Sequence, residues 1–157
     1  MKKIILSAAI LIAGFSAANA QATASQAVTL TLVNSISITL SAATSSFSFA
    51  NTADFEAGLT NTSAATATVK SNRPWSVTVK AATANFTGSV VTPMPASVLG
   101  VRLTGPAAFV PLSTTAAAFT SGAKGSNTFT VDYNANPGFI YDAGTYNMSV
   151  VYTATQQ

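Results

Sequence analysis

Residues Ala27 to Leu40 read AVTLTLVNSISITL, and this stretch decides the fold class of the chain. A period of two, with apolar side chains at even positions and Thr or Ser at most odd ones, is typical of a strand with one buried face. The stretch therefore predicts a β-protein that opens with a strand. The apolar side chains at even positions are Val28, Leu30, Leu32, Ile36, Ile38 and Leu40.

The fourteen residues of this stretch are too many for an ordinary strand. At about 3.3 Å per residue they would span roughly 45 Å, more than twice the usual length. Asn34 is the one polar residue at an even position. We therefore expect either one strand bent at Asn34-Ser35 or two segments in tandem. In the second case, residues 21–34 are an N-terminal extension that can pair outside its own domain.

The residues before this stretch predict a secretory signal peptide over residues 1–20. Lys2 and Lys3 form a positive N-terminus, an apolar run follows over 4–15, and Ala18-Asn19-Ala20 is a small-residue cleavage site. We expect cleavage after Ala20, transit through the periplasm, and a mature protein that is secreted or held at the cell surface. The apolar run is short for a membrane span, so no transmembrane segment is expected in the mature chain.

Charged residues make up only 7 % of the chain, far below the usual share of about a quarter. Removing Lys2 and Lys3 leaves five basic and four acidic residues, a formal net charge of +1. No basic patch is then available for phosphate contacts, so we expect no nucleic-acid partner. Low charge also means little repulsion between copies, which favours self-association.

The chain contains neither His nor Cys. It therefore lacks the commonest general base, the usual zinc, copper and iron–sulfur ligands, and any disulfide. Ser and Thr are plentiful, but without His the usual general base that would activate one of them as a nucleophile is missing. The four acids provide no pair facing across a site, as a glycosidase requires, because two share a loop and another belongs to a turn. We expect no enzymatic activity, no metal site and no cofactor. The acids are Asp54, Glu56, Asp132 and Asp142.

Short alternating segments recur along the rest of the chain, bounded by Gly, Pro and Asn, and no long amphipathic helix is evident. The pattern predicts an all-β fold, an antiparallel immunoglobulin-like (Greek-key) β-sandwich formed as one domain by residues 35–157. Strands are expected over residues 45–50, 64–70, 75–80, 86–91, 98–103, 127–133 and 145–154, with a loop over 51–61 and a segment compatible with a helical turn over 116–119.

The segment Asp142-Ala143-Gly144-Thr145-Tyr146 resembles the tyrosine corner of Greek-key sandwiches. In that corner a Tyr near the start of a late strand bonds back to the upstream backbone. Met148 stands where an immunoglobulin domain has Cys. The alternative is an ordinary Gly turn followed by a strand. On the corner interpretation, residues 147–157 complete one strand and leave none for the final strand.

The C-terminal segment AGTYNMSVVYTATQQ resembles the closing strand of chaperone–usher-type fimbrial subunits and of related spore-coat-U-like secreted domains of bacteria. A weaker resemblance, to Gram-positive WxL-type surface domains, rests on the isolated Trp75 and the terminal Tyr strand. The fimbrial resemblance implies an incomplete sandwich that a neighbouring subunit completes. Many such subunits carry a disulfide, which this chain lacks. The implied acceptor or closing strand contains Tyr146, Met148, Val150 and Tyr152.

The same resemblance marks QATASQAVTLTLV, directly after the signal peptide, as a donor strand. Its pocket residues are then Val28, Leu30 and Leu32. The implied protein is a non-enzymatic structural subunit of a bacterial surface filament, pilus or extracellular coat that self-associates by strand exchange. Its implied partners are further copies of itself, as a homopolymer, and a periplasmic chaperone.

Two alternatives stay open at this point. Residues 27–40 can be a first strand that bends from one sheet of its own domain to the other. The protein can also be a monomeric cell-surface binding module for glycans, with Trp75, Phe139 and Tyr141 as ligand contacts. Trp75 alternates with Val77 and Val79, however, a pattern more typical of a core position.

Overall fold

A computed structural model describes residues 21–88 and 91–157, so the expected signal peptide lies outside the described residues. The chain divides into two units, Met1–Leu32 and Val33–Gln157. We call residues 21–32 the tail and Val33–Gln157 the body. Among the described residues, no helix has the length and hydrophobicity needed to cross a membrane.

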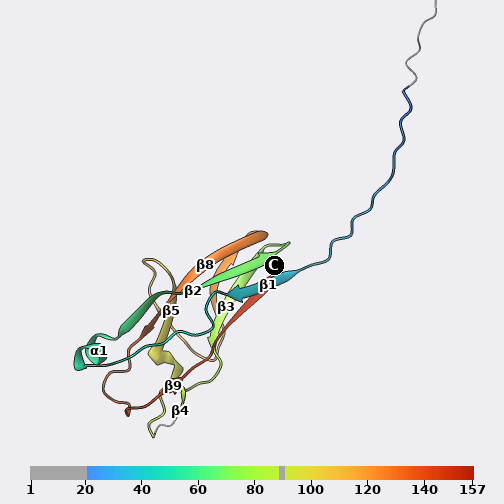
Figure 1. Ribbon diagram of the computed structural model, residues 1–157. Helices are drawn as coiled ribbons and strands as arrows, with labels where there is room; N and C mark the ends of the chain where they lie inside the picture. The colour runs from blue at the N-terminus through green and yellow to red at the C-terminus, as the bar shows by residue number, and fades with distance from the viewer. Residues whose placement is uncertain (1–20, 89–90) are drawn as a thin grey trace, which may run out of the picture. The chain divides into compact units, whose positions relative to one another are not determined.

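The body is built mainly from strands (Figure 1). In chain order the described elements are β1 (Ile36–Leu40), α1 (Thr52–Ala57), β2 (Leu59–Ser71), β3 (Trp75–Ala81), β4 (Thr87–Gly88), a 3-10 helix η1 (Ala96–Val98), β5 (Leu99–Leu103), β6 (Val110–Pro111), β7 (Ala117–Gly122), β8 (Gly125–Ala135), β9 (Tyr146–Asn147) and β10 (Val150–Gln156).

These strands form one five-stranded, one three-stranded and one two-stranded sheet. Their strand orders are β1-β2-β8-β5-β6, β10-β3-β7 and β4-β9. Every pairing between described strands is antiparallel. The prediction of an all-β, antiparallel fold is therefore confirmed.

The core lies between the two larger sheets and follows from the period of two. On β3, Trp75, Val77 and Val79 are at most 3 % exposed, while the residues between them are half-buried. From the opposing sheet, Val69 of β2 and Val131 of β8 are fully buried. Each strand therefore turns one face into the core, because successive side chains point to opposite sides of a sheet.

Residues 51–61 contain a short helix and the start of β2 instead of the expected loop. Asn51 caps helix α1, since its side chain accepts a hydrogen bond from the Asp54 N–H and the Asp54 carboxylate accepts from the Asn51 N–H. This reciprocal pair is a capping box. Gly58 ends the helix at φ +73°, a conformation that favours glycine. Six residues are too few for a periodic apolar pattern to reveal such a helix.

Residues 117–122 form strand β7 and not a helical turn. Their place beside β3 depends on Gly122, because a Cβ there would lie 2.3 Å from Cζ2 of Trp75. Small residues therefore allow this strand to lie against the largest side chain of the core.

Three other expected strands differ from those observed. Residues 45–50 contain no strand, although Phe47 and Phe49 pack against the core. In the region of 86–91, the only described strand is β4. The expected strand over 145–154 is divided into β9 and β10.

Replacing a fully buried valine measures how much this core contributes to the free energy of unfolding. We expect Val101→Ala to lower the free energy of unfolding by about 2 kcal/mol, because methyl groups leave the core and a cavity remains. Urea unfolding followed by Trp75 fluorescence is the measurement. The matched control is Val91→Ala at a side chain that is 89 % exposed, for which we expect less than about 0.5 kcal/mol. Equal losses would contradict the core assignment.

Candidate functional site

The tail carries the alternating apolar residues outside any strand. Residues 21–35 have no regular secondary structure, and β1 begins at Ile36. The side chains of Val28, Leu30 and Leu32 are 77 %, 84 % and 86 % exposed. Three exposed aliphatic side chains in one row form a surface that gains free energy when a partner covers it.

The chain enters the body at a hydrogen-bonded junction. The Ser35 N–H donates to Oδ1 of Asn72 over 3.0 Å, and Nδ2 of Asn72 donates to the Val33 carbonyl over 2.6 Å. Nε2 of Gln156 donates to the Ser35 carbonyl over 2.8 Å. The start of β1, the β2–β3 turn and the end of β10 therefore meet at one end of the body.

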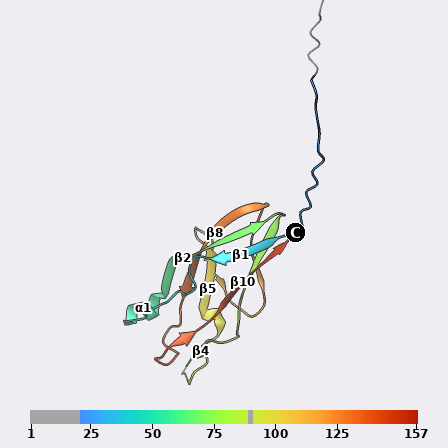
Figure 2. The same cartoon turned by 45° about the vertical axis from the view of Figure 1, so that its right-hand side comes forward.

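Two strand edges are open beside this junction. Within the described residues, β1 pairs with β2 alone and β10 pairs with β3 alone. The two strands lie side by side although they belong to different sheets (Figure 2). An edge strand presents unpaired backbone donors and acceptors that can bind a further strand.

Apolar side chains between these edges are incompletely covered. Ile36 and Ile38 of β1 and Tyr152 and Ala154 of β10 are half-buried against the core cluster of Val69, Trp75 and Val77. Leu40, the last residue of β1, is 42 % exposed. The seam between β1 and β10 therefore combines open backbone edges with a partly exposed apolar floor.

The four residues expected on one closing strand do not share a strand. Tyr146 lies in β9, Met148 follows it outside any strand, and Val150 and Tyr152 lie in β10. Met148, Val150 and Tyr152 pack against the main core. The break between β9 and β10 separates Tyr146 from them.

Tyr146 makes the hydrogen bond expected of a tyrosine corner. Its hydroxyl donates to the Asp142 carbonyl over 2.7 Å. This bond closes the segment that leads into β9, as the motif predicts. The result supports the corner interpretation over an ordinary Gly turn.

Tyr152 links the open edge strand to the opposite sheet. Its hydroxyl lies 2.9 Å from that of Tyr133 on β8. Burial raises the pKa of the Tyr152 hydroxyl, as do the neighbouring Tyr133 charge and this hydrogen bond. The hydroxyl therefore stays neutral, which fits a structural role inside the core.

The three residues expected to contact a glycan lie in different environments. Trp75 is 3 % exposed and stacks on Phe129 at a centroid distance of 6.4 Å, so its indole offers no face to a ligand. We therefore discard Trp75 as a ligand contact. Tyr141 is half-buried, whereas Phe139 is 61 % exposed and stacks on Phe55 of α1 at 5.4 Å.

The most buried acid serves as a structural anchor. The Asp132 side chain is 1 % exposed and pairs with Nε of Arg102 at 3.0 Å. It also accepts hydrogen bonds from the Thr104 hydroxyl and from the Ser63 N–H, at 2.6 and 2.9 Å. Ser63 lies in an irregularity of β2 at φ +54°. Asp132 therefore fixes this bulge onto the sheet, a role that the sequence pattern does not reveal.

The hydrogen bonds of Asp132 also set its ionisation. Burial alone raises its pKa, but hydrogen bonds from Thr104, Ser63 and Arg102, with the charge of Arg102, outweigh burial and hold the pKa below its ordinary value of 3.8. Among the described residues, no three acids gather as they would around a metal ion.

No family model matches the chain, and no curated protein matches it.

The lowered pKa of Asp132 predicts a specific acid response. Its ionised form stabilises the fold above the unfolded value of 3.8, and this contribution is lost as the pH falls through the folded-state pKa. We expect Asp132→Asn to cost about 2–4 kcal/mol at about pH 6. That deficit should shrink as the pH approaches about 2. Urea unfolding of both proteins across this range measures it.

The control for the acid response is Glu56→Gln, which changes an exposed acid and should leave the free energy of unfolding within about 0.5 kcal/mol of the wild type. A deficit of Asp132→Asn that stays constant with pH would show that ionisation of Asp132 contributes nothing.

Proposed function

We propose that this protein is a secreted, non-enzymatic structural subunit of a bacterial surface filament or extracellular coat, in which the tail of one copy completes the sandwich of the next. The observation that carries the proposal is the exposed row of Val28, Leu30 and Leu32 in a chain whose seam between β1 and β10 has two open edges. One copy thus has both a strand to donate and a place for one.

The strand order supports an immunoglobulin-like sandwich that lacks one strand. In an immunoglobulin domain, one sheet has the order A-B-E-D, and the other contains C, F and G. The order β1-β2-β8-β5 corresponds to the first sheet, and β3 with β10 corresponds to C and F. The position of strand G, beyond β10, is then free. Strand β7 departs from the immunoglobulin order. It lies beside β3, the counterpart of strand C, but it follows β5, the counterpart of strand D, in the chain.

The direction of the strands favours donation between copies. The tail joins the body at Ser35, at the end where β10 finishes. A strand folded back from Ser35 along β10 would therefore run parallel to it. A tail from another copy is free to run antiparallel, which is the direction of every described pairing in the body.

The energetics are adequate for a stable contact. Burial of three aliphatic side chains at about 1.5–3 kcal/mol each, with a strand of backbone hydrogen bonds, gives a gross gain of roughly 5–10 kcal/mol. Ordering the tail removes part of this gain. With no Cys in the chain, no disulfide can link the copies of such a polymer.

A charge on the apolar face of the tail tests the proposal. We expect Leu30→Asp in the full chain to reduce SDS-resistant ladders at least about a hundredfold, because the neighbour would have to bury a carboxylate. Thr31→Asp is the matched control, since it places the same charge on the other face of an extended tail. Ladders on unboiled gels and negative-stain electron microscopy are the measurements.

A peptide of residues 21–34 provides a second arm of this test. Added to the Leu30→Asp protein, it should raise the unfolding temperature by occupying the empty seam, while the same peptide carrying Leu30→Asp should have no effect. Loss of ladders in both variants, or ladders in both, would refute the donor role of the apolar face.

A second candidate function is glycan binding at Phe139 and Tyr141. It is favoured by the exposed side chain of Phe139, whose ring stacks on the ring of Phe55. Exposed, rigidly held aromatic rings are suited to stacking on flat ligands.

If this second function holds, Phe139→Ala should weaken binding of a surface polysaccharide at least about tenfold by calorimetry, because the stacking face is lost. Ile140→Ala, at a neighbouring side chain that is 73 % exposed, should leave affinity within about threefold. No heat of binding across a broad glycan panel would exclude this function.

A further inference from the structure

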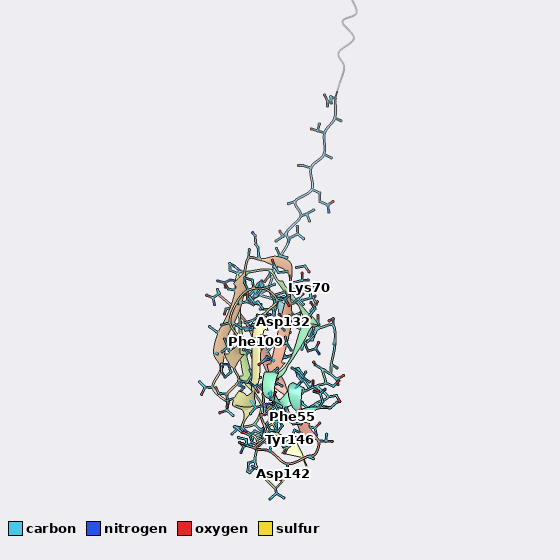
Figure 3. All side chains as sticks on the ribbon, turned by 90° about the vertical axis from the view of Figure 1, so that its left-hand side faces the viewer. Phe55, Lys70, Phe109, Asp132, Asp142 and Tyr146 are labelled. Carbon is cyan, nitrogen blue, oxygen red and sulfur yellow. The ribbon has the colours of Figure 1, made fainter. Side chains whose placement is uncertain are left out.

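Most of the charged side chains of the body are separated by sign. The Asp132–Arg102 ion pair neutralises two of them. Of the others, three cations lie at one end and three acids lie at the opposite end, where Lys80 of β3, paired with Val151 of β10, adds one positive charge. Figure 3 shows Lys70 and Asp142 at opposite ends of the body. The two groups are Lys70, Arg73 and Lys124, and Asp54, Glu56 and Asp142.

The basic end is the end that carries the tail. Lys70 and Lys124 line one shallow hollow together with Ser35, where the chain enters the body. Arg73 lies in the exposed turn between β2 and β3. Gln157 reaches the same turn, its N–H donating to the Pro74 carbonyl over 2.8 Å.

The acidic end is held together by aromatic stacking. Asp54 and Glu56 belong to α1, and Phe55 between them stacks on Phe139 of the loop between β8 and β9. Asp142 of the same loop accepts hydrogen bonds from the N–H and hydroxyl of Thr92, at 3.1 and 2.8 Å. Ile140, 73 % exposed, and Phe139 add an apolar centre to this acidic end.

We propose that the acidic end of one copy docks on the basic end of the next, so that subunits stack head to tail through their bodies as well as through the tail. The occupant of each end is a second copy of this chain, because the two ends have opposite charge. The apolar centre around Phe139 then faces Val33, which is 77 % exposed at the basic end.

This contact rests on the proposed strand exchange for its geometry, and the two fit together. A donated tail that runs antiparallel to β10 has its C-terminal end at Val150, where β10 begins. That is the acidic end, since Val150 follows the Tyr146–Asp142 corner. The basic end of the donor, to which the tail is joined, is thereby brought against the acidic end of the acceptor.

Exposed charges of this kind act mainly on docking rate and orientation. Complementary patches accelerate encounter and disfavour reversed approach. Their attraction is screened over about 10 Å at 0.1 M salt. The contact should therefore speed assembly at low salt, while the buried tail holds the assembled polymer.

Charge reversal in the full chain tests the contact. The first variant, Arg73→Glu with Lys124→Glu, reverses the basic end. The second, Glu56→Lys with Asp142→Lys, reverses the acidic end. Each alone should assemble about tenfold more slowly at low salt, because like charges then meet. Mixed one to one, they should recover to within about twofold of the wild-type rate, since opposite ends again face each other.

The controls separate charge from folding. Lys80→Glu makes the acidic end more negative without reversing its sign, so this variant should assemble at least as fast as the wild type. Glu56→Lys with Asp142→Asn, which keeps an acceptor for Thr92, replaces the acidic-end variant if that variant fails to fold. Circular dichroism checks folding, and the initial rate of SDS-resistant ladders is measured at about 0.02 and 0.5 M salt, where the difference should disappear.

The outcomes distinguish this contact from the proposed strand exchange. Reversed variants that form ladders at the wild-type rate would overturn the end contact and leave strand exchange intact. If the wild type forms no ladders but sediments as salt-sensitive oligomers that charge reversal disrupts, the end contact stands and strand exchange fails. Monomers at every salt concentration would overturn both, and polysaccharide binding by such monomers would assign the acidic end to a glycan.

Discussion

The structure depends on burial of alternating side chains between two sheets, because no disulfide supports the fold. Valines of β2, β5 and β8 face Trp75, Val77 and Val79 of β3, and these side chains exclude water from the space between the sheets. The open edges of the body lie where this packing ends. At β1 and β10 the sheets stop without partners among the described residues, and the core is only partly covered.

Open edges are usually blunted by charge, by short strands or by a covering segment, because they otherwise pair with other chains. In this protein β1 and β10 carry no charged side chain, and the charges of the body lie mainly at its two ends. Such an arrangement leaves the seam accessible to a strand and gives the ends opposite signs. Both features favour ordered association of copies over random contact, which is why we propose a role in assembly.

Predictions from sequence succeeded where the period of two was strong and failed where structure depends on distant contacts. The alternation of Trp75 to Lys80 correctly indicated β3 and the burial of its indole. The hydrogen bond of Tyr146 followed from a five-residue motif, because donor and acceptor are close in the chain. Strand β7 was missed because its weak sequence becomes a strand only by pairing with β3.

The sequence by itself determined the all-β class, the apolar row of the tail, and the absence of His and Cys chemistry, since each is a property of residue identity or of neighbouring positions. Only the tertiary structure decided which strands are edges, that Asp132 is an anchor, and that Lys124 and Asp142 lie at opposite ends. These features depend on pairings between residues far apart in the chain. A local pattern fixes which face of a strand is apolar, but not which strand lies beside it.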